Sequence, residues 1–178
     1  MVKQLIGALI GGLILFFWQF ASWSALNIHG SQNSYTANQS QILEYLSGNL
    51  PQGEYFLPTV APGASPEEMA KLQEDVMGKP WARVQMFESF EMNMGMNMFR
   101  GFIVNFVSVF LLCWILMKIP QRDFMTVFLS SLAVGVIGYM TLPYLESIWF
   151  QGDTIPELID TFVQWGICGA FLGWWLNR

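Results

Sequence analysis

The chain has 178 residues, of which 53% are hydrophobic, 16% aromatic and only 12% charged. Soluble domains carry about a quarter charged residues, so this composition excludes an ordinary soluble protein and indicates a membrane protein. The net charge of -5 at pH 7 argues against a nucleic-acid partner, which a basic surface would attract.

Four apolar stretches are close to the length that crosses a hydrocarbon core of about 30 Å. They are residues 5–20, 102–117, 124–142 and 158–176. The sequence therefore predicts an all-α membrane protein, a four-transmembrane-helix bundle with a small α+β extracytoplasmic domain between helices 1 and 2. The predicted segments are residues 1–23 for the first transmembrane helix, 24–98 for the extracytoplasmic domain, and 99–178 for transmembrane helices 2–4 with their short loops.

Basic residues near the ends of the stretches predict the orientation of the chain. Lys and Arg beside a span resist translocation, and Lys3, Lys118, Arg122 and Arg178 all fall on one side of a four-span threading. Both termini are then cytoplasmic, and the segment 24–98, which carries most of the acidic residues, lies outside. The first stretch has an alternative interpretation as a cleaved signal peptide, but its length and composition favour a retained anchor.

Small residues in the first and fourth stretches predict close helix contacts. Gly7 and Gly11 are one helical turn apart, as are Gly169 and Gly173. Glycines at this spacing let helix backbones approach each other in lipid. Packing of the helices within one chain is the favoured interpretation, and contact between copies of the chain is the alternative.

The long loop carries signals for two helices and two strands. Ser65 and Glu68 form the ends of a capping box, and Asn38 with Gln41 is a weaker start signal of the same kind. Alternating apolar residues predict the strands. So few elements make a marginal core, which we expect to be stabilised by contact with the membrane surface, a second copy or another subunit. The predicted helices are 38–48 and 65–77, and the predicted strands are 55–57 and 81–87.

Four methionines alternate just before the second apolar stretch: Met92, Met94, Met96 and Met98. In an extended segment their thioethers would share one face, and thioethers are ligands for Cu(I). The favoured interpretation is adaptable packing in the first turns of a helix. No other metal or cofactor site is predicted.

Polar residues inside the predicted spans are few, and Asn105 and Gln164 are the main ones. Scattered neutral groups of this kind more often tie helices together than line a pathway. The fourth span is predicted to begin with a capping box of Thr154 and Glu157.

No catalytic motif is present. His29 is the only histidine, so it cannot form a zinc site alone, and it is interpreted as a hydrogen-bonding residue of an exposed loop. Carboxylates near the outer face leave an intramembrane hydrolase open as an alternative, although the helix dipole by itself explains Glu157 and Asp160.

Several short patterns occur in a suggestive order: FWQFASW at 17–23, NQSQIL at 38–43, YFLP at 55–58, and LPY through WF at 142–150. In this order the chain resembles an uncharacterised family of bacterial four-span inner-membrane proteins, a domain of unknown function. The resemblance implies a bacterial inner membrane and the four-span topology, and it implies no activity.

The function expected from the sequence is that of a non-enzymatic accessory or scaffold subunit of a larger membrane assembly. Its expected partners are the lipid bilayer and either another protein or a second copy. The alternative is a binding module for a lipid, a quinone or Cu(I) at the outer interface.

Overall fold

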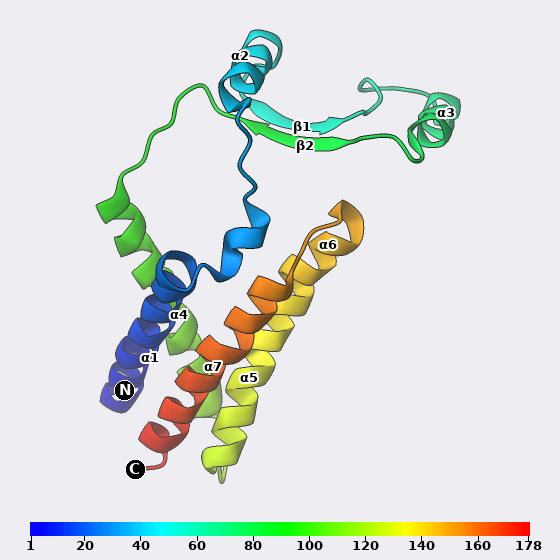
Figure 1. Ribbon diagram of the computed structural model, residues 1–178. Helices are drawn as coiled ribbons and strands as arrows, with labels where there is room; N and C mark the ends of the chain where they lie inside the picture. Colours follow the sequence, from blue (N-terminus) through cyan, green and yellow to red (C-terminus); the bar gives the residue numbers. More distant parts are fainter. The chain divides into compact units, whose positions relative to one another are not determined.

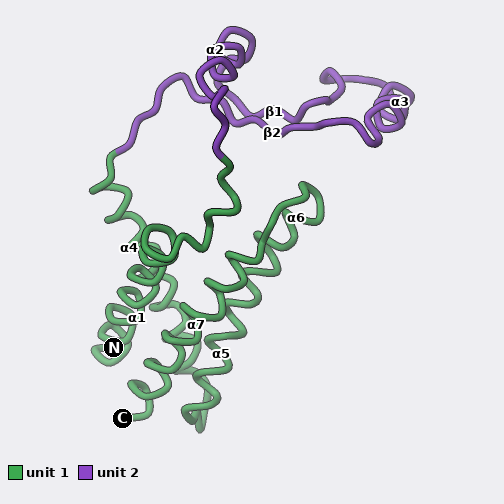
Figure 2. Tube along the Cα trace, in the orientation of Figure 1, with its two compact units in different colours: residues 1–34, 93–178 green, residues 35–92 purple.

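The computed structural model describes all 178 residues, most of which are helical. It divides into two compact units (Figure 2). Residues 1–34 and 93–178 form one, here called the helical unit, and residues 35–92 form the other, the inserted unit. Residues 24–34 and 93–98, which the sequence assigned to the extracytoplasmic domain, therefore belong to the helical unit.

The helical unit is built from four long helices (Figure 1). Helix α1 packs against α4 and α7, and α7 packs against α5. Short turns extend the ends of α1 and α5. The bounds are α1 (Val2–Phe20), η1 (Ala21–Ala25), η2 (Ile28–Gln32), α4 (Met94–Leu116), α5 (Phe124–Tyr139), η3 (Met140–Tyr144), α6 (Leu145–Phe150) and α7 (Ile155–Leu176).

Three helical stretches are long and apolar enough to cross a membrane: Val2–Ala25, Met94–Leu116 and Phe124–Phe150. The chain thus has the features of a multi-pass membrane protein. Helix α7 is 22 residues long but is not among the three. It carries Glu157, Asp160 and Gln164, which reduce its hydropathy, so the fourth predicted span stays a prediction.

Apolar side chains from α1, α4, α5 and α7 form the core of the helical unit, and glycines bring the backbones together. A Cβ on Gly11 would lie 2.7 Å from Val109 Cγ1 of α4, and one on Gly169 would lie 2.8 Å from Ser131 Cβ of α5. All four glycines singled out in the sequence lie at helix contacts within this chain. The buried core residues are Leu15, Val109, Leu112, Cys113, Leu116, Val127, Cys168, Leu172 and Leu176.

The inserted unit contains α2 (Gln39–Asn49), β1 (Gly53–Leu57), α3 (Pro66–Val76) and β2 (Ala82–Met86). The predicted helices and strands are confirmed, and the two strands pair antiparallel with Tyr55 opposite Val84. The predicted capping box forms, since Ser65 Oγ accepts from Glu68 N and Glu68 Oε2 accepts from Ser65 N. The predicted cap of α2 is wrong in one respect: Asn38 occupies the N-cap position, but its side chain makes no capping bond.

Candidate functional site

A groove lies between α4 and α5. A short loop joins these helices at one end, and they diverge toward the other end (Figure 1). The groove has a volume of about 690 Å³, and α1 and α7 contribute to its walls. Its size is that of a site for a small molecule or a lipid, since ligand pockets span roughly 300 to 1,000 Å³.

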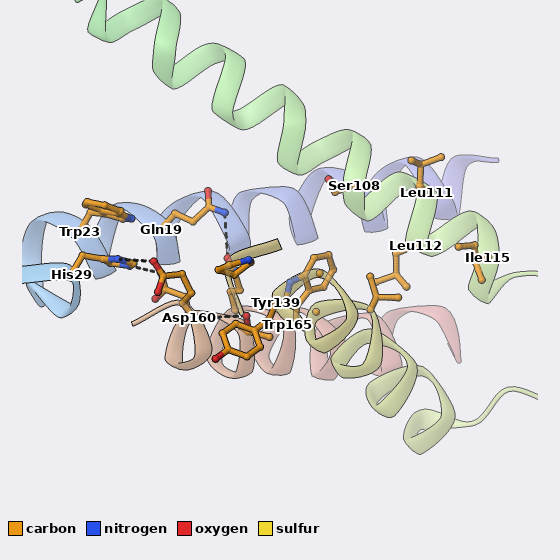
Figure 3. Close-up of a pocket in the computed structure, with 17 residues that line it drawn as sticks. Gln19, Trp23, His29, Ser108, Leu111, Leu112, Ile115, Tyr139, Asp160 and Trp165 are labelled. Atoms are coloured by element: carbon orange, nitrogen blue, oxygen red, sulfur yellow. Dashed lines mark hydrogen bonds and ion pairs between the residues drawn. The ribbon is translucent and has the colours of Figure 1, made fainter. Parts of the chain in front are cut away.

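The two ends of the groove differ in polarity (Figure 3). Trp23, His29 and Asp160 lie together at one end. Leu111 and Ile115 of α4 lie at the other end, where the walls are apolar. The groove therefore offers polar partners at one end and a hydrocarbon-like surface at the other.

The polar end is organised by a buried pair of His29 and Asp160. His29 Nε2 lies 2.9 Å from Asp160 Oδ2, and the two residues are only 4% and 7% exposed. Asp160 Oδ1 accepts from Trp18 Nε1 at 3.0 Å and from Ser22 Oγ at 2.6 Å. One carboxylate of α7 thus joins α1, η1 and η2. The prediction that His29 lies in an exposed loop is wrong, because this carboxylate draws the ring into the helical unit.

Hydrogen bonds around His29 favour the doubly protonated ring. Gln32 Nε2 donates to Glu157 Oε1 at 2.6 Å and to the Asp153 carbonyl at 3.0 Å. These bonds turn the amide oxygen of Gln32 toward His29 Nδ1, 2.8 Å away. Both ring nitrogens then face acceptors, an arrangement that favours the imidazolium over the neutral ring.

The surroundings of His29 raise its pKa above the ordinary value of 6.5. Burial is the largest single effect and lowers the pKa, but the hydrogen bonds from Asp160 and Gln32 and the charges of Asp160 and Glu157 together outweigh it. Trp23 stacks on the ring with centroids 4.0 Å apart and an interplanar angle of 6°. An aromatic face is favourable beside a cationic ring.

A second polar cluster lies where α1, α4 and α7 meet. Asn105 Nδ2 donates to Gln19 Oε1 at 2.8 Å, and Gln19 Nε2 lies 3.3 Å from both Asn105 Oδ1 and Gln164 Oε1. Asn105 and Gln164 were singled out in the sequence as intramembrane polar residues. Gln19, which joins them, was not, although a glutamine in an apolar helix is the signal that would have found it.

The start of α7 differs from the predicted capping box. The Thr154 side chain makes no capping bond, and its Oγ1 instead lies 3.0 Å from the Tyr139 hydroxyl of α5. Asp153 Oδ1 accepts from Ile155 N at 3.0 Å in its place. The prediction of a box formed by Thr154 and Glu157 is therefore wrong, since both side chains have partners on other elements.

The methionine run is helical from Met94 onward, and Met92 precedes the helix. Its side chains are exposed, and their thioethers do not share the single face that an extended segment would give. No group of three or more His, Cys, Asp and Glu residues is arranged to hold a metal ion. Ser22 bonds to the carboxylate of Asp160 rather than to His29, so these three residues do not form a nucleophile, base and acid in series.

No protein-family model, curated protein or solved structure matches this chain. The fold and the groove define its class: a mostly helical protein with three helices able to cross a membrane and a groove that is polar at one end. The resemblance to a bacterial four-span family stays a prediction.

Proposed function

We propose that this is a multi-pass protein of the bacterial inner membrane that binds an amphiphilic, lipid-like molecule in the groove between α4 and α5. The change of polarity along the groove carries the proposal. An amphiphile has a polar head and an apolar body, which match the end beside His29 and Asp160 and the end beside Leu111 and Ile115.

In this proposal α7 is a fourth transmembrane helix. Its polar side chains have partners within the protein, since Asp160 accepts from Trp18 and Ser22, and Gln164 accepts from Gln19. Polar groups paired in this way are tolerated inside a bilayer. With four spans, both termini lie on one side of the membrane and residues 24–98 on the other, and the basic residues near the span ends favour the cytoplasm for the termini.

Filling the groove tests the binding function. Gly138 lines the groove, and a Cβ there meets nothing within 4 Å. We expect Gly138→Leu to fold and to lose bound amphiphile, measured by mass spectrometry of lipids extracted from the purified protein. Gly101→Leu is the matched control, because Gly101 also has open space but does not line the groove. Equal lipid content in both variants and the wild type would contradict the proposal.

A second candidate function is that of an accessory subunit, and the surface of the inserted unit favours it. No residue from 35 to 92 is buried, and Tyr45 and Phe90 are 70% and 87% exposed. A partner protein that covers these side chains would complete the core. Purification in mild detergent tests this, and a stable, monodisperse monomer with no partner would count against it.

A further inference from the structure

We propose that the groove selects an amphiphile whose head group is a primary ammonium, as in a glycerophospholipid of the ethanolamine type. The inference rests on the proposed binding function and names the chemistry of the ligand. It is carried by the net negative charge of the groove lining and by Glu157, whose carboxylate has one oxygen without a hydrogen-bond donor.

The titratable side chains that line the groove carry a net negative charge. The lining contains His29, Glu157 and Asp160, and no Lys or Arg. His29 Nε2 lies 2.9 Å from Asp160 and His29 Nδ1 lies 3.9 Å from Glu157, so a single imidazole faces two carboxylates. The positive end of the α7 dipole is met by Asp153, whose Oδ1 accepts from Ile155 N. The lining therefore stays negative even when His29 is protonated, and it offers an anionic head group no Lys or Arg.

Glu157 also has an oxygen without a hydrogen-bond donor. Its Oε1 accepts from Gln32, while its buried Oε2 has no partner in the protein. The side chain lines the groove and keeps 31% of its surface exposed, so a cation in the groove can approach the carboxylate. A buried carboxylate oxygen without a donor is unfavourable, and an ammonium supplies three N–H donors and the opposite charge.

Donors further along α7 fit the rest of such a lipid. Gln164 and Trp165 line the groove, and Gln164 Nε2 and Trp165 Nε1 donate to no acceptor within the protein. They follow Glu157 by about two turns, or roughly 11 Å along the helix axis. Ester carbonyls of a glycerolipid whose ammonium lies at Glu157 can accept from them, and the acyl chains then lie along Leu111 and Ile115.

The test compares three lipids with identical acyl chains in competition for the purified full-length protein, with bound lipid measured by native mass spectrometry. Phosphatidylethanolamine carries N–H donors, phosphatidylcholine carries a cation without N–H, and phosphatidylglycerol carries a net negative charge. A charge-assisted hydrogen bond predicts retention of phosphatidylethanolamine about tenfold above each of the others.

Glu157→Gln should remove this preference, because the amide keeps a polar side chain of the same size but carries no charge. Glu67→Gln is the control, since Glu67 is an exposed residue of α3 and its substitution changes the net charge equally. Equal retention of all three lipids by the wild-type protein would overturn the ammonium inference and leave amphiphile binding intact. Absence of any retained lipid would overturn both.

Discussion

The carboxylate of Asp160 links α7 to three other segments of the helical unit. Its carboxylate accepts from Trp18, Ser22 and His29, which lie more than 130 residues away along the chain. From the sequence, this acid near a helix start was fully explained by the helix dipole. Its partners were not predictable, because pairing over this separation depends on how α1 and α7 pack.

His29 gives the stability of the protein a pH dependence. Because folding raises the pKa of His29, the folded chain holds its proton at a pH where the unfolded chain has released it. The stabilisation is fully present below about pH 6.5 and is lost as the pH rises through the folded pKa. We expect the thermal midpoint of the purified protein to fall across this window.

The matched variant for this pH dependence is His29→Gln. His29 is the only histidine of the chain, and a glutamine keeps hydrogen bonding without titrating. Thermal midpoints of this variant should change little between pH 6 and pH 8. A slope equal to that of the wild type would show that His29 is not the titrating group.

Gly135 holds the packing of α5 against α7. A Cβ at this position would lie 2.3 Å from Cδ1 of Trp165, so Gly135→Ala must displace the indole ring. Overpacking of this kind costs about 1–3 kcal/mol, and we expect a lower thermal midpoint in detergent. Gly138→Ala is the control, because its Cβ meets nothing within 4 Å, and an equal loss in both variants would contradict this explanation.

At the scale of elements, a helix cap was predicted correctly where both of its residues lie in one turn and have no other partner. The box of Ser65 and Glu68 forms as its sequence indicates. The equivalent signal at Thr154 fails because Tyr139 of α5 provides a competing partner for the hydroxyl. Short-range patterns therefore predict caps on solvent-exposed helices such as α3, and tertiary contacts override them within the helical unit.

The cap of α3 has a measurable effect on local stability. Ser65→Ala removes the acceptor of Glu68 N, which typically costs about 1 kcal/mol, so amide hydrogen exchange across α3 should accelerate about fivefold. Asn38→Ala provides the comparison, since Asn38 is an N-cap without a side-chain bond. Its substitution should change exchange in α2 much less, and equal effects at both caps would argue against the assigned role of Ser65.

At the scale of the whole molecule, composition predicted the membrane class, with which three candidate spans agree, and alternating apolar residues predicted the small sheet. The groove was not predictable. It depends on the divergence of α4 and α5, which follows from α4 packing on α1 and α5 packing on α7. The pattern of apolar residues within α4 or α5 does not indicate which neighbouring helix each one packs against, and so it does not predict their divergence.

The number of spans is tested by labelling single cysteines from each side of the membrane. The native cysteines, Cys113 and Cys168, are buried and free. With four spans, Glu67→Cys should react with an impermeant thiol reagent in intact spheroplasts, and Asn177→Cys should react only after the membrane is opened. Labelling of both from the same side would contradict the four-span topology and the proposed location of residues 24–98.

The inserted unit is one continuous segment, residues 35–92, between two parts of the helical unit that end at residue 34 and resume at residue 93. None of the core residues of the helical unit comes from it. Replacing residues 35–92 by a flexible linker should therefore leave a protein that still assembles its helices and the groove. Such a shortened chain would show whether amphiphile binding in the groove is independent of partner binding by the inserted unit.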